Sequence, residues 1–197
     1  MRPALLALTL LALPAVAQMP GRPDPKLVRA GTYRVDPNHT QVTWEVNHLG
    51  FSLLSGQFGA SGGQLTLDPA RPAATKLEVT FDAAQMSTTS PRFSDHLKSA
   101  DFFDVAKHPT ARFVSRSVAV RGTKATIAGD LTIKGVTKPV ILDATFVGAG
   151  ANPRGGKTNI GFRATGAVKR SDFGLGMAAP AVSDRVDLVV NAAFEAA

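Results

Sequence analysis

The side chains best suited to acid–base or metal chemistry are the four histidines, His39, His48, His96 and His108. His39 and His48 lie nine residues apart in a mainly extended segment, a separation of about 30 Å at ~3.3 Å per residue. They can share a metal ion only if the chain folds back at residues 47–50. His96 and His108 have no partner at metal-site spacing, so hydrogen bonding to loop backbone is their favoured role, with His96 as an alternative contact for a bound ligand. We therefore predict no metal site and no cofactor.

A catalytic site needs an activated nucleophile as well as an acid and a base. Asp95, His96 and Asp101 could supply the acid and base for hydrolysis or isomerisation. The chain has no cysteine, and no serine stands in a Gly-x-Ser-x-Gly elbow. We expect a protein that is not an enzyme, with a secreted enzyme acting around His96 as the alternative.

The segment from Arg170 to Gly174 places a basic and an acidic side chain, Arg170 and Asp172, two residues apart and hence on one face of an extended chain. An Arg170–Asp172 ion pair that pins the loop is the slightly favoured interpretation. Alternatively, the planar guanidinium of Arg170 presents its donors to a phosphate or quinol oxygen of a ligand.

The chain has thirteen aromatic side chains, eleven Phe, one Trp and one Tyr. Those in strand-like segments are Trp44, Phe58, Phe81, Phe113, Phe146 and Phe162, and those beside loops are Phe102, Phe103 and Phe173. Each alone is typical of an ordinary core residue, but the set can line an apolar tube inside a barrel of about eight strands. We predict a ligand-binding site formed by these aromatic residues together with His48, His96, Arg170 and Asp172.

Strands must position these residues, because apolar and polar positions alternate with a period of two along most of the chain. The clearest case is a long hairpin in which Lys124–Ile133 and Val140–Val147 are joined near Gly135. The other alternating segments are 40–46, 53–60, 64–67, 76–81, 111–120, 158–169 and 185–194, which gives about eight or nine strands. Turn signals at 61–63, 121–123 and 148–156 indicate an antiparallel meander, and glycines within strands suit the bends of a closing sheet. The predicted fold class is an all-β antiparallel barrel rather than an open sandwich.

One segment departs from the β pattern. Ser90 can cap a helix, and Pro91 suits its first position. The apolar side chains at helical spacing are Phe93, Leu97 and Ala100. We expect this short helix, with the two phenylalanines that follow it, to form an apolar plug or lid across one barrel end; a helix packed on the outside wall is the alternative.

The N-terminus has the pattern of a signal peptide, with Arg2, an apolar run over residues 4–13 and small residues at 15–17. This predicts export to the periplasm, with residues 1–17 removed. The apolar run is roughly half of the ~20 residues that a membrane helix needs, so we predict no transmembrane segment. Residues 18–30 carry three prolines and three basic residues with almost nothing to bury, which predicts a mobile leader, and residues 31–197 suffice for one domain.

The net charge favours anionic partners slightly. The chain has 22 basic and 15 acidic residues, and the balance becomes 21 − 15 = +6 once Arg2 is removed. The basic residues are scattered rather than gathered in one stripe, so nucleic acid is not an expected partner. The sequence is compatible with association as a homodimer.

Six ordered motifs are similar to a known family. They are Tyr33–His39 (YRVDPNH), His48–Gly50 (HLG), Gly56–Phe58 (GQF), Asp95–Leu97 (DHL) with Asp101–Asp104 (DFFD), Gly129–Val140 (GDLTIKGVTKPV) and Lys169–Gly174 (KRSDFG). Together they resemble the YceI-like family of bacterial polyisoprenoid-binding proteins. The resemblance implies an extended lipocalin-like barrel that holds a long isoprenoid tail in its lumen, with the polar head near the opening. Two positions depart from the family pattern: Ser94 replaces a frequent acidic residue, and Thr40 replaces a common serine.

The expected function is therefore a periplasmic carrier for an isoprenoid lipid, such as a polyprenyl chain, a quinone precursor or a polyprenyl diphosphate. Burial of hydrocarbon contributes roughly 0.8 kcal/mol per methylene, so ten carbons contribute about 8 kcal/mol before ordering costs of several kcal/mol. The tail rather than the head should thus dominate affinity. The alternatives are a secreted hydrolase or isomerase acting on a lipidic substrate near His96, and a ligand-free structural or stress-related barrel.

Overall fold

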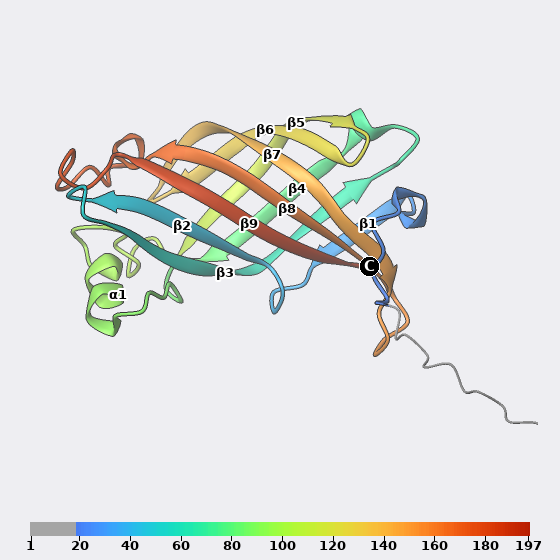
Figure 1. Ribbon diagram of the computed structural model, residues 1–197, viewed down its shortest axis with the longest axis horizontal. Helices are drawn as coiled ribbons and strands as arrows, with labels where there is room; N and C mark the ends of the chain where they lie inside the picture. The colour runs from blue at the N-terminus through green and yellow to red at the C-terminus, as the bar shows by residue number, and fades with distance from the viewer. Residues whose placement is uncertain (1–18) are drawn as a thin grey trace, which may run out of the picture.

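The computed structural model describes residues 19–197, which form an elongated antiparallel β-barrel (Figure 1). Its strands are β1 (Gly31–Val35), β2 (Gln41–His48), β3 (Ser52–Leu67), β4 (Lys76–Asp82), β5 (Thr110–Arg121), β6 (Lys124–Ile133), β7 (Val136–Ala151), β8 (Thr158–Lys169) and β9 (Arg185–Ala196). Its helical segments are the α-helix α1 (Pro91–Lys98) and the 3-10 turns η1 (Pro25–Leu27), η2 (Pro72–Ala74) and η3 (Arg170–Phe173). The predicted signal peptide lies outside the described residues. No helix of residues 19–197 combines the length and apolar character needed to span a bilayer.

Eight strand positions close the barrel. The order β3-β2-β9-β8-β7-β6-β5-β4 is completed by pairing of β4 with β3, and every ladder is antiparallel. β1 continues the position of β2, because it pairs with the second half of β3 (Gly31 with Leu67) and with the end of β9 (Tyr33 with Ala196). The predicted all-β, lipocalin-like barrel is thus confirmed.

The wall strand formed by β1 and β2 is interrupted at residues 36–40, and Thr40 seals the interruption. Its side chain is 1% exposed. Its Oγ1 donates to the carbonyl of Ala193 and accepts from the Ala193 N–H, both at 3.0 Å. The Thr40 carbonyl accepts from the N–H of Ala60 at 2.9 Å. A hydroxyl at this position therefore satisfies backbone groups that a continuous strand would have paired.

The structure corrects the predicted turn at residues 61–63. β3 runs without a break through this segment, and its register against β4 shifts between Ala60 and Gly62. Gly63 has φ +138°, and a Cβ there would lie 2.2 Å from the carbonyl oxygen of Glu78. Gly63 therefore allows close approach of two strands, and the segment does not reverse the chain.

Three other strand boundaries differ from the predictions. β1 was not predicted as a strand. β7 continues to Ala151, which confines the predicted 148–156 turn to residues 152–157. β7 begins at Val136 rather than at the predicted Val140, so Pro139 lies inside the strand, opposite Asp130. The Lys134–Gly135 turn before β7 has positive φ at both residues, as two-residue hairpin turns require.

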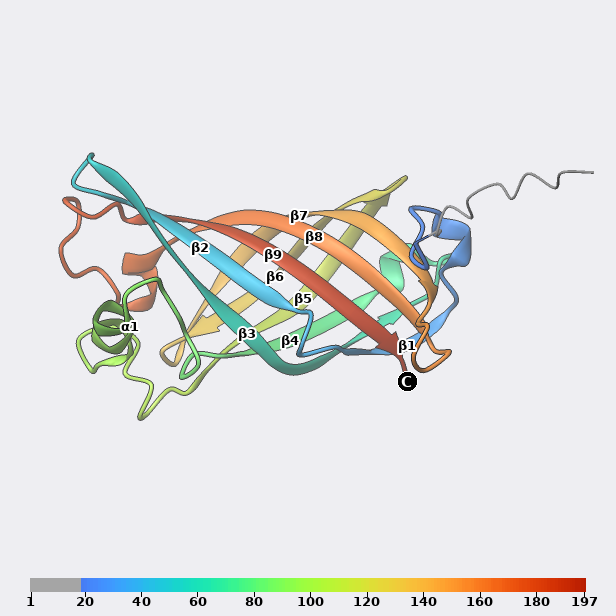
Figure 2. The ribbon, with the colours of Figure 1, turned by 60° about the horizontal axis from the view of Figure 1, so that its bottom comes forward.

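Helix α1 covers one end of the barrel (Figures 1 and 2). Ser90 caps it by accepting from the N–H of Phe93 at 3.3 Å, and Pro91 occupies the first turn, both as predicted. Leu97 is buried, and Phe93, Phe102 and Phe103 pack against the same core cluster. The apolar face of the segment thus meets the barrel interior, and we call residues 88–109 the lid.

The N-terminal segment differs from its prediction as a leader with almost nothing to bury. Arg22 exchanges two backbone hydrogen bonds with Ala149, at 3.0 and 2.9 Å. Leu27 and Val28 are partly buried against the core. The described part of this segment therefore lies against the barrel end opposite the lid.

Candidate functional site

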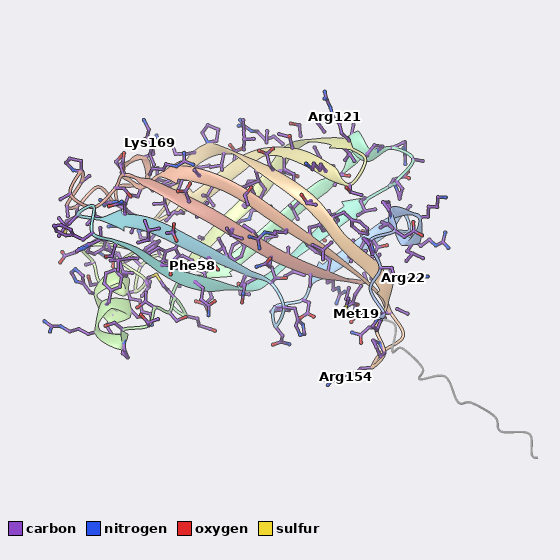
Figure 3. The ribbon with its side chains drawn as sticks, in the orientation of Figure 1. Met19, Arg22, Phe58, Arg121, Arg154 and Lys169 are labelled. Atoms are coloured by element: carbon purple, nitrogen blue, oxygen red, sulfur yellow. The ribbon has the colours of Figure 1, made fainter. Side chains whose placement is uncertain are left out.

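The barrel encloses two adjoining apolar cavities. A cavity of about 430 Å³ lies beneath the lid, and one of about 300 Å³ lies toward the opposite end. Both are lined by Phe81, Phe113, Leu142 and Val190, which mark the junction between them. In Figure 3, Lys169 marks the lid end, while Arg22 and Arg121 mark the far end. We call the two spaces the lid-end cavity and the far-end cavity, and together they form the lumen.

The structure places twelve of the thirteen predicted site residues on the lumen. Those lining the lid-end cavity alone are Trp44, His48, Phe58, His96, Phe102, Phe103, Arg170 and Phe173, those lining the far-end cavity alone are Phe146 and Phe162, and those lining both are Phe81 and Phe113. Asp172 is exposed and lines neither cavity. Alternation along each strand brings the aromatic side chains to one surface, because every second residue of a barrel strand points inward.

Edge-to-face aromatic contacts link the lid and the walls. Phe103 of the lid meets Phe58 of β3 with ring centroids 5.4 Å apart. In the far-end cavity, Phe162 contacts Phe146 at 5.8 Å and Phe194 at 6.2 Å. Such pairs contribute about 0.5–1.5 kcal/mol beyond the area they bury. The first contact holds the lid against β3, and the other two fix the positions of the side chains around the far-end cavity.

Arg170 is held by the loop that follows it rather than by Asp172. Its guanidinium donates to the carbonyls of Leu175, Met177 (2.7 Å), Val182 (2.7 Å) and Ser183 (2.8 Å). The side chain is 8% exposed, and burial lowers its pKa from the ordinary arginine value. The predicted Arg170–Asp172 ion pair is therefore wrong. Most of the five guanidinium N–H groups donate to backbone carbonyls, so few remain for the predicted contact with a ligand.

The acidic residue that supports this region is Asp184. It accepts hydrogen bonds from the hydroxyl of Ser171 at 2.7 Å and from the Ser171 N–H at 2.8 Å. These bonds hold the pKa of Asp184 below its ordinary value, and the Arg170 charge lowers it further. Because residues 170–173 form a 3-10 turn, Asp172 does not share a face with Arg170 as it would in a strand.

Two histidines lie at the lid end of the lumen. His48 is half-buried at the end of β2, and His96 is exposed on α1, with its ring edge-on to Phe102 at 4.8 Å. His39 instead contacts Asp36, with Nδ1 2.6 Å from the carboxylate. In residues 19–197 no group of three or more His, Cys, Asp or Glu side chains could hold a metal ion.

Gly56 belongs to the GQF motif and is not among the predicted site residues, although it makes room for Trp44. The two residues face each other across β2 and β3. A Cβ at position 56 would lie 2.4 Å from the indole Cζ2 and 2.8 Å from the carbonyl oxygen of Ser87. The indole Nε1 is buried and has no hydrogen-bond partner among the described residues. The sequence signal for this role was a glycine, Gly56, at an inward position where the neighbouring inward residues, Leu54 and Phe58, are large and apolar.

Other lumen residues were missed for different reasons. Phe93 and Phe194 are aromatic residues in predicted elements, so extending the aromatic set would have found them. Met177 and Val182 also line the lid-end cavity, but they belong to an irregular loop without periodicity. No local pattern identifies such residues.

Comparison with known proteins agrees with this architecture. The YceI-like domain family matches residues 33–194. The protein YceI of Escherichia coli O157:H7 is 41% identical over 164 residues, covering 82% of this chain and 85% of that protein. The crystal structure of Burkholderia cenocepacia BcnA superposes with a TM-score of 0.69 at 26% identity, covering 81% of this chain and 98% of that one. A polyisoprenoid binding domain from Saccharophagus degradans, implicated in plant cell wall breakdown, shares the fold with a TM-score of 0.60 at 13% identity, covering 84% and 98%.

The six sequence motifs fall within the matched region, which extends from β1 into β9 and includes the lid. The relationship therefore covers the whole barrel rather than an isolated motif. The chain belongs to the YceI-like domain family.

Proposed function

We propose that the protein is a periplasmic carrier that holds one polyisoprenoid lipid in the lumen of its barrel. The observation that carries this proposal is the pair of adjoining cavities with predominantly apolar walls. The Saccharophagus degradans neighbour, described as a polyisoprenoid binding domain, has the same fold and supports the ligand class. The signal-peptide pattern of residues 1–17 supports the periplasmic location.

The dimensions of the lumen suit a long, slender tail. The cavities, about 430 and 300 Å³, lie within the range of about 300–1,000 Å³ that is usual for ligand pockets. They lie end to end in a barrel whose longest strands have 16 residues, about 50 Å at ~3.3 Å per residue. A flexible hydrocarbon chain can occupy both cavities by passing Phe81 and Phe113. Each buried methylene contributes roughly 0.8 kcal/mol, so binding does not depend on a charged anchor.

The polar residues around the lid-end cavity favour a neutral head group. His48 and His96 offer ring nitrogens there, whereas most donors of Arg170 are bound to backbone carbonyls. A quinol, phenol or alcohol needs only one or two such contacts. A diphosphate needs several free cationic donors, and Arg170 cannot supply them without releasing its loop.

The two alternative functions, a ligand-free structural barrel and a hydrolase or isomerase, account for fewer of these features than a lipid carrier does. A ligand-free structural barrel does not account for two apolar cavities that no side chain of residues 19–197 fills, since protein interiors normally pack closely. For a hydrolase, His96 would need a partner, yet in the described part of the chain no hydrogen bond or ion pair joins its ring to Asp95 or Asp101. The ring instead packs against Phe102.

The proposal is tested by purifying the protein from the periplasm of its own bacterium, extracting it with organic solvent and identifying lipids by mass spectrometry. We expect one class of polyprenyl compound in near-stoichiometric amount. Adding that compound to the extracted protein should raise its Tm, because a ligand that binds only the folded state stabilises it. An empty extract, together with no change in Tm on adding polyprenyl alcohols or quinones, would contradict the proposal and favour a ligand-free barrel.

A further inference from the structure

Large exposed apolar side chains gather at the lid end of the barrel. Phe51 is 89% exposed, Leu53 61%, Leu49 50% and Met177 47%. Leu49 and Phe51 belong to the β2–β3 turn, Leu53 to the start of β3 and Met177 to the loop of residues 174–184. The turn and the loop lie side by side in both ribbon views (Figures 1 and 2). The N–H of Leu49 donates to the carbonyl of Ala181 at 2.8 Å, which joins the two loops. We call these four side chains the mouth patch.

Asp184, which is held by Ser171 at the end of its loop, is the only charged side chain in the two loops of the mouth patch. Residues 46–67 and 173–183 contain no Asp, Glu, Lys or Arg. Moving a charge into an apolar medium costs far more than moving a neutral group, so this uncharged surface can enter such a medium at low cost. Its composition is unusual in a chain with 22 basic and 15 acidic residues.

The backbone of the mouth patch is also largely satisfied internally. The N–H of Gly50 donates to Asn47 Oδ1 at 2.7 Å, and that of Phe51 donates to the carbonyl of His48 at 3.1 Å. The N–H of Ser183 donates to the carbonyl of Asn47 at 2.8 Å. A segment that enters lipid must pair its backbone polar groups within the protein, because lipid offers no partners.

The mouth patch is continuous with the lumen. Met177 belongs to the patch and also lines the lid-end cavity. His48 and Leu54, the neighbours of Leu49 and Leu53 in sequence, line the same cavity. An apolar surface therefore extends from the exposed loops to the interior.

We propose that the mouth patch docks the lid end of the barrel on a phospholipid bilayer, with Phe51 and its neighbours inserted among the acyl chains. A second copy of the chain is a poorer occupant. A stable protein interface buries about 800 Å² on each partner over complementary faces, whereas this patch consists of only four side chains. This inference goes beyond the proposed function, because docking depends on the outer surface and not on the contents of the lumen.

The test is flotation of the lipid-extracted mature protein with vesicles of phosphatidylethanolamine and phosphatidylglycerol. The wild-type protein should float with the vesicles, and the double variant Phe51→Ser, Leu53→Asp should bind them at least about tenfold more weakly. The matched control is Ile141→Asp, since Ile141 is 62% exposed on β7, outside the mouth patch, and the change adds the same charge. The control should float like the wild type.

Equal flotation of the three proteins, or no flotation of the wild type, would overturn the inference once circular dichroism shows that all three fold. The inference would also be overturned if no protein floats and sedimentation shows that the wild type is a dimer and the double variant a monomer. The patch would then join two copies of the chain. A protein that floats yet yields no isoprenoid on extraction would overturn only the proposed function.

Discussion

At the residue scale, Arg170 acts as a structural link between the barrel and the loop that borders the lumen. The variant Arg170→Met removes the donors to four carbonyls while keeping an apolar stem. Hydrogen bonds to a charged group each contribute about 1.5–3 kcal/mol, so we expect the free energy of unfolding to fall by about 3 kcal/mol or more. Chemical denaturation measures this change. Arg163→Met, at an exposed position on β8, should change it by less than about 0.5 kcal/mol, and equal effects of the two variants would contradict the assigned role.

Asp184 should make the stability of the same region depend on pH. Its pKa in the folded protein lies below the ordinary value of about 3.9, mainly because Ser171 donates to it. The stabilisation is therefore fully present above about pH 4 and is lost as the pH falls through the folded pKa. Asp184→Asn should lower the Tm at pH 7, and its deficit relative to the wild type should shrink as the pH falls below about 4.

Thermal unfolding from pH 7 to pH 2.5 measures this convergence. Asp172→Asn is the control, because Asp172 is exposed and accepts no hydrogen bond within residues 19–197. A constant deficit for Asp184→Asn across the range would show that the charge of Asp184 contributes nothing.

At the scale of elements, the pairing of β2 with β3 depends on Gly56. In Gly56→Ala the added methyl would overlap the Trp44 indole and the Ser87 carbonyl. Overpacking costs typically about 1–3 kcal/mol, and we expect a loss of this size with a shifted tryptophan emission spectrum. Gly59→Ala on the same strand is the control, because a Cβ there meets nothing within 4 Å. A Gly56→Ala protein with wild-type stability and emission would show that the indole can move aside freely.

The elements themselves were only partly predictable from sequence. The β6–β7 hairpin and the capped helix were predicted correctly because alternation and capping are local signals. The sequence Ser61-Gly62-Gly63 indicates a turn, but pairing with β4 overrides that local preference and keeps β3 continuous. β1 has only five residues, too few for a periodic pattern to be distinctive.

The same limit applies to the candidate site. Aromatic residues on predicted strands could be assigned to the lumen, because strand periodicity fixes the face. The hydrogen-bond partners of Arg170 could not be predicted, since they are backbone carbonyls of an irregular loop. Asp172 is predicted as the partner of Arg170 on the assumption of an extended chain, where the structure has a 3-10 turn, and no local signal pointed to Asp184.

At the scale of the whole molecule, ligand retention should depend on the inward face of the barrel wall and not on the outward face. Phe146 and Val147 are adjacent on β7 but point to opposite sides: Phe146 lines the far-end cavity, and Val147 is 59% exposed. Phe146→Asp places an unpaired carboxylate among hydrocarbon groups, whereas Val147→Asp places the same group in water. An unpaired charge in an apolar environment costs several kcal/mol, so the inward variant should lose most of its bound lipid and the outward variant should keep it.

The measurement is the amount of lipid per protein after identical purification, with circular dichroism to confirm folding. Phe146→Trp adds bulk instead of charge in the far-end cavity, and it should also reduce retention of a long tail, which covers the case in which the Asp variant unfolds. If the ligand occupied only the lid-end cavity, both Phe146 variants would retain lipid like the wild type. Loss of lipid in both Phe146 variants and not in Val147→Asp would show that the bound lipid reaches the far-end cavity.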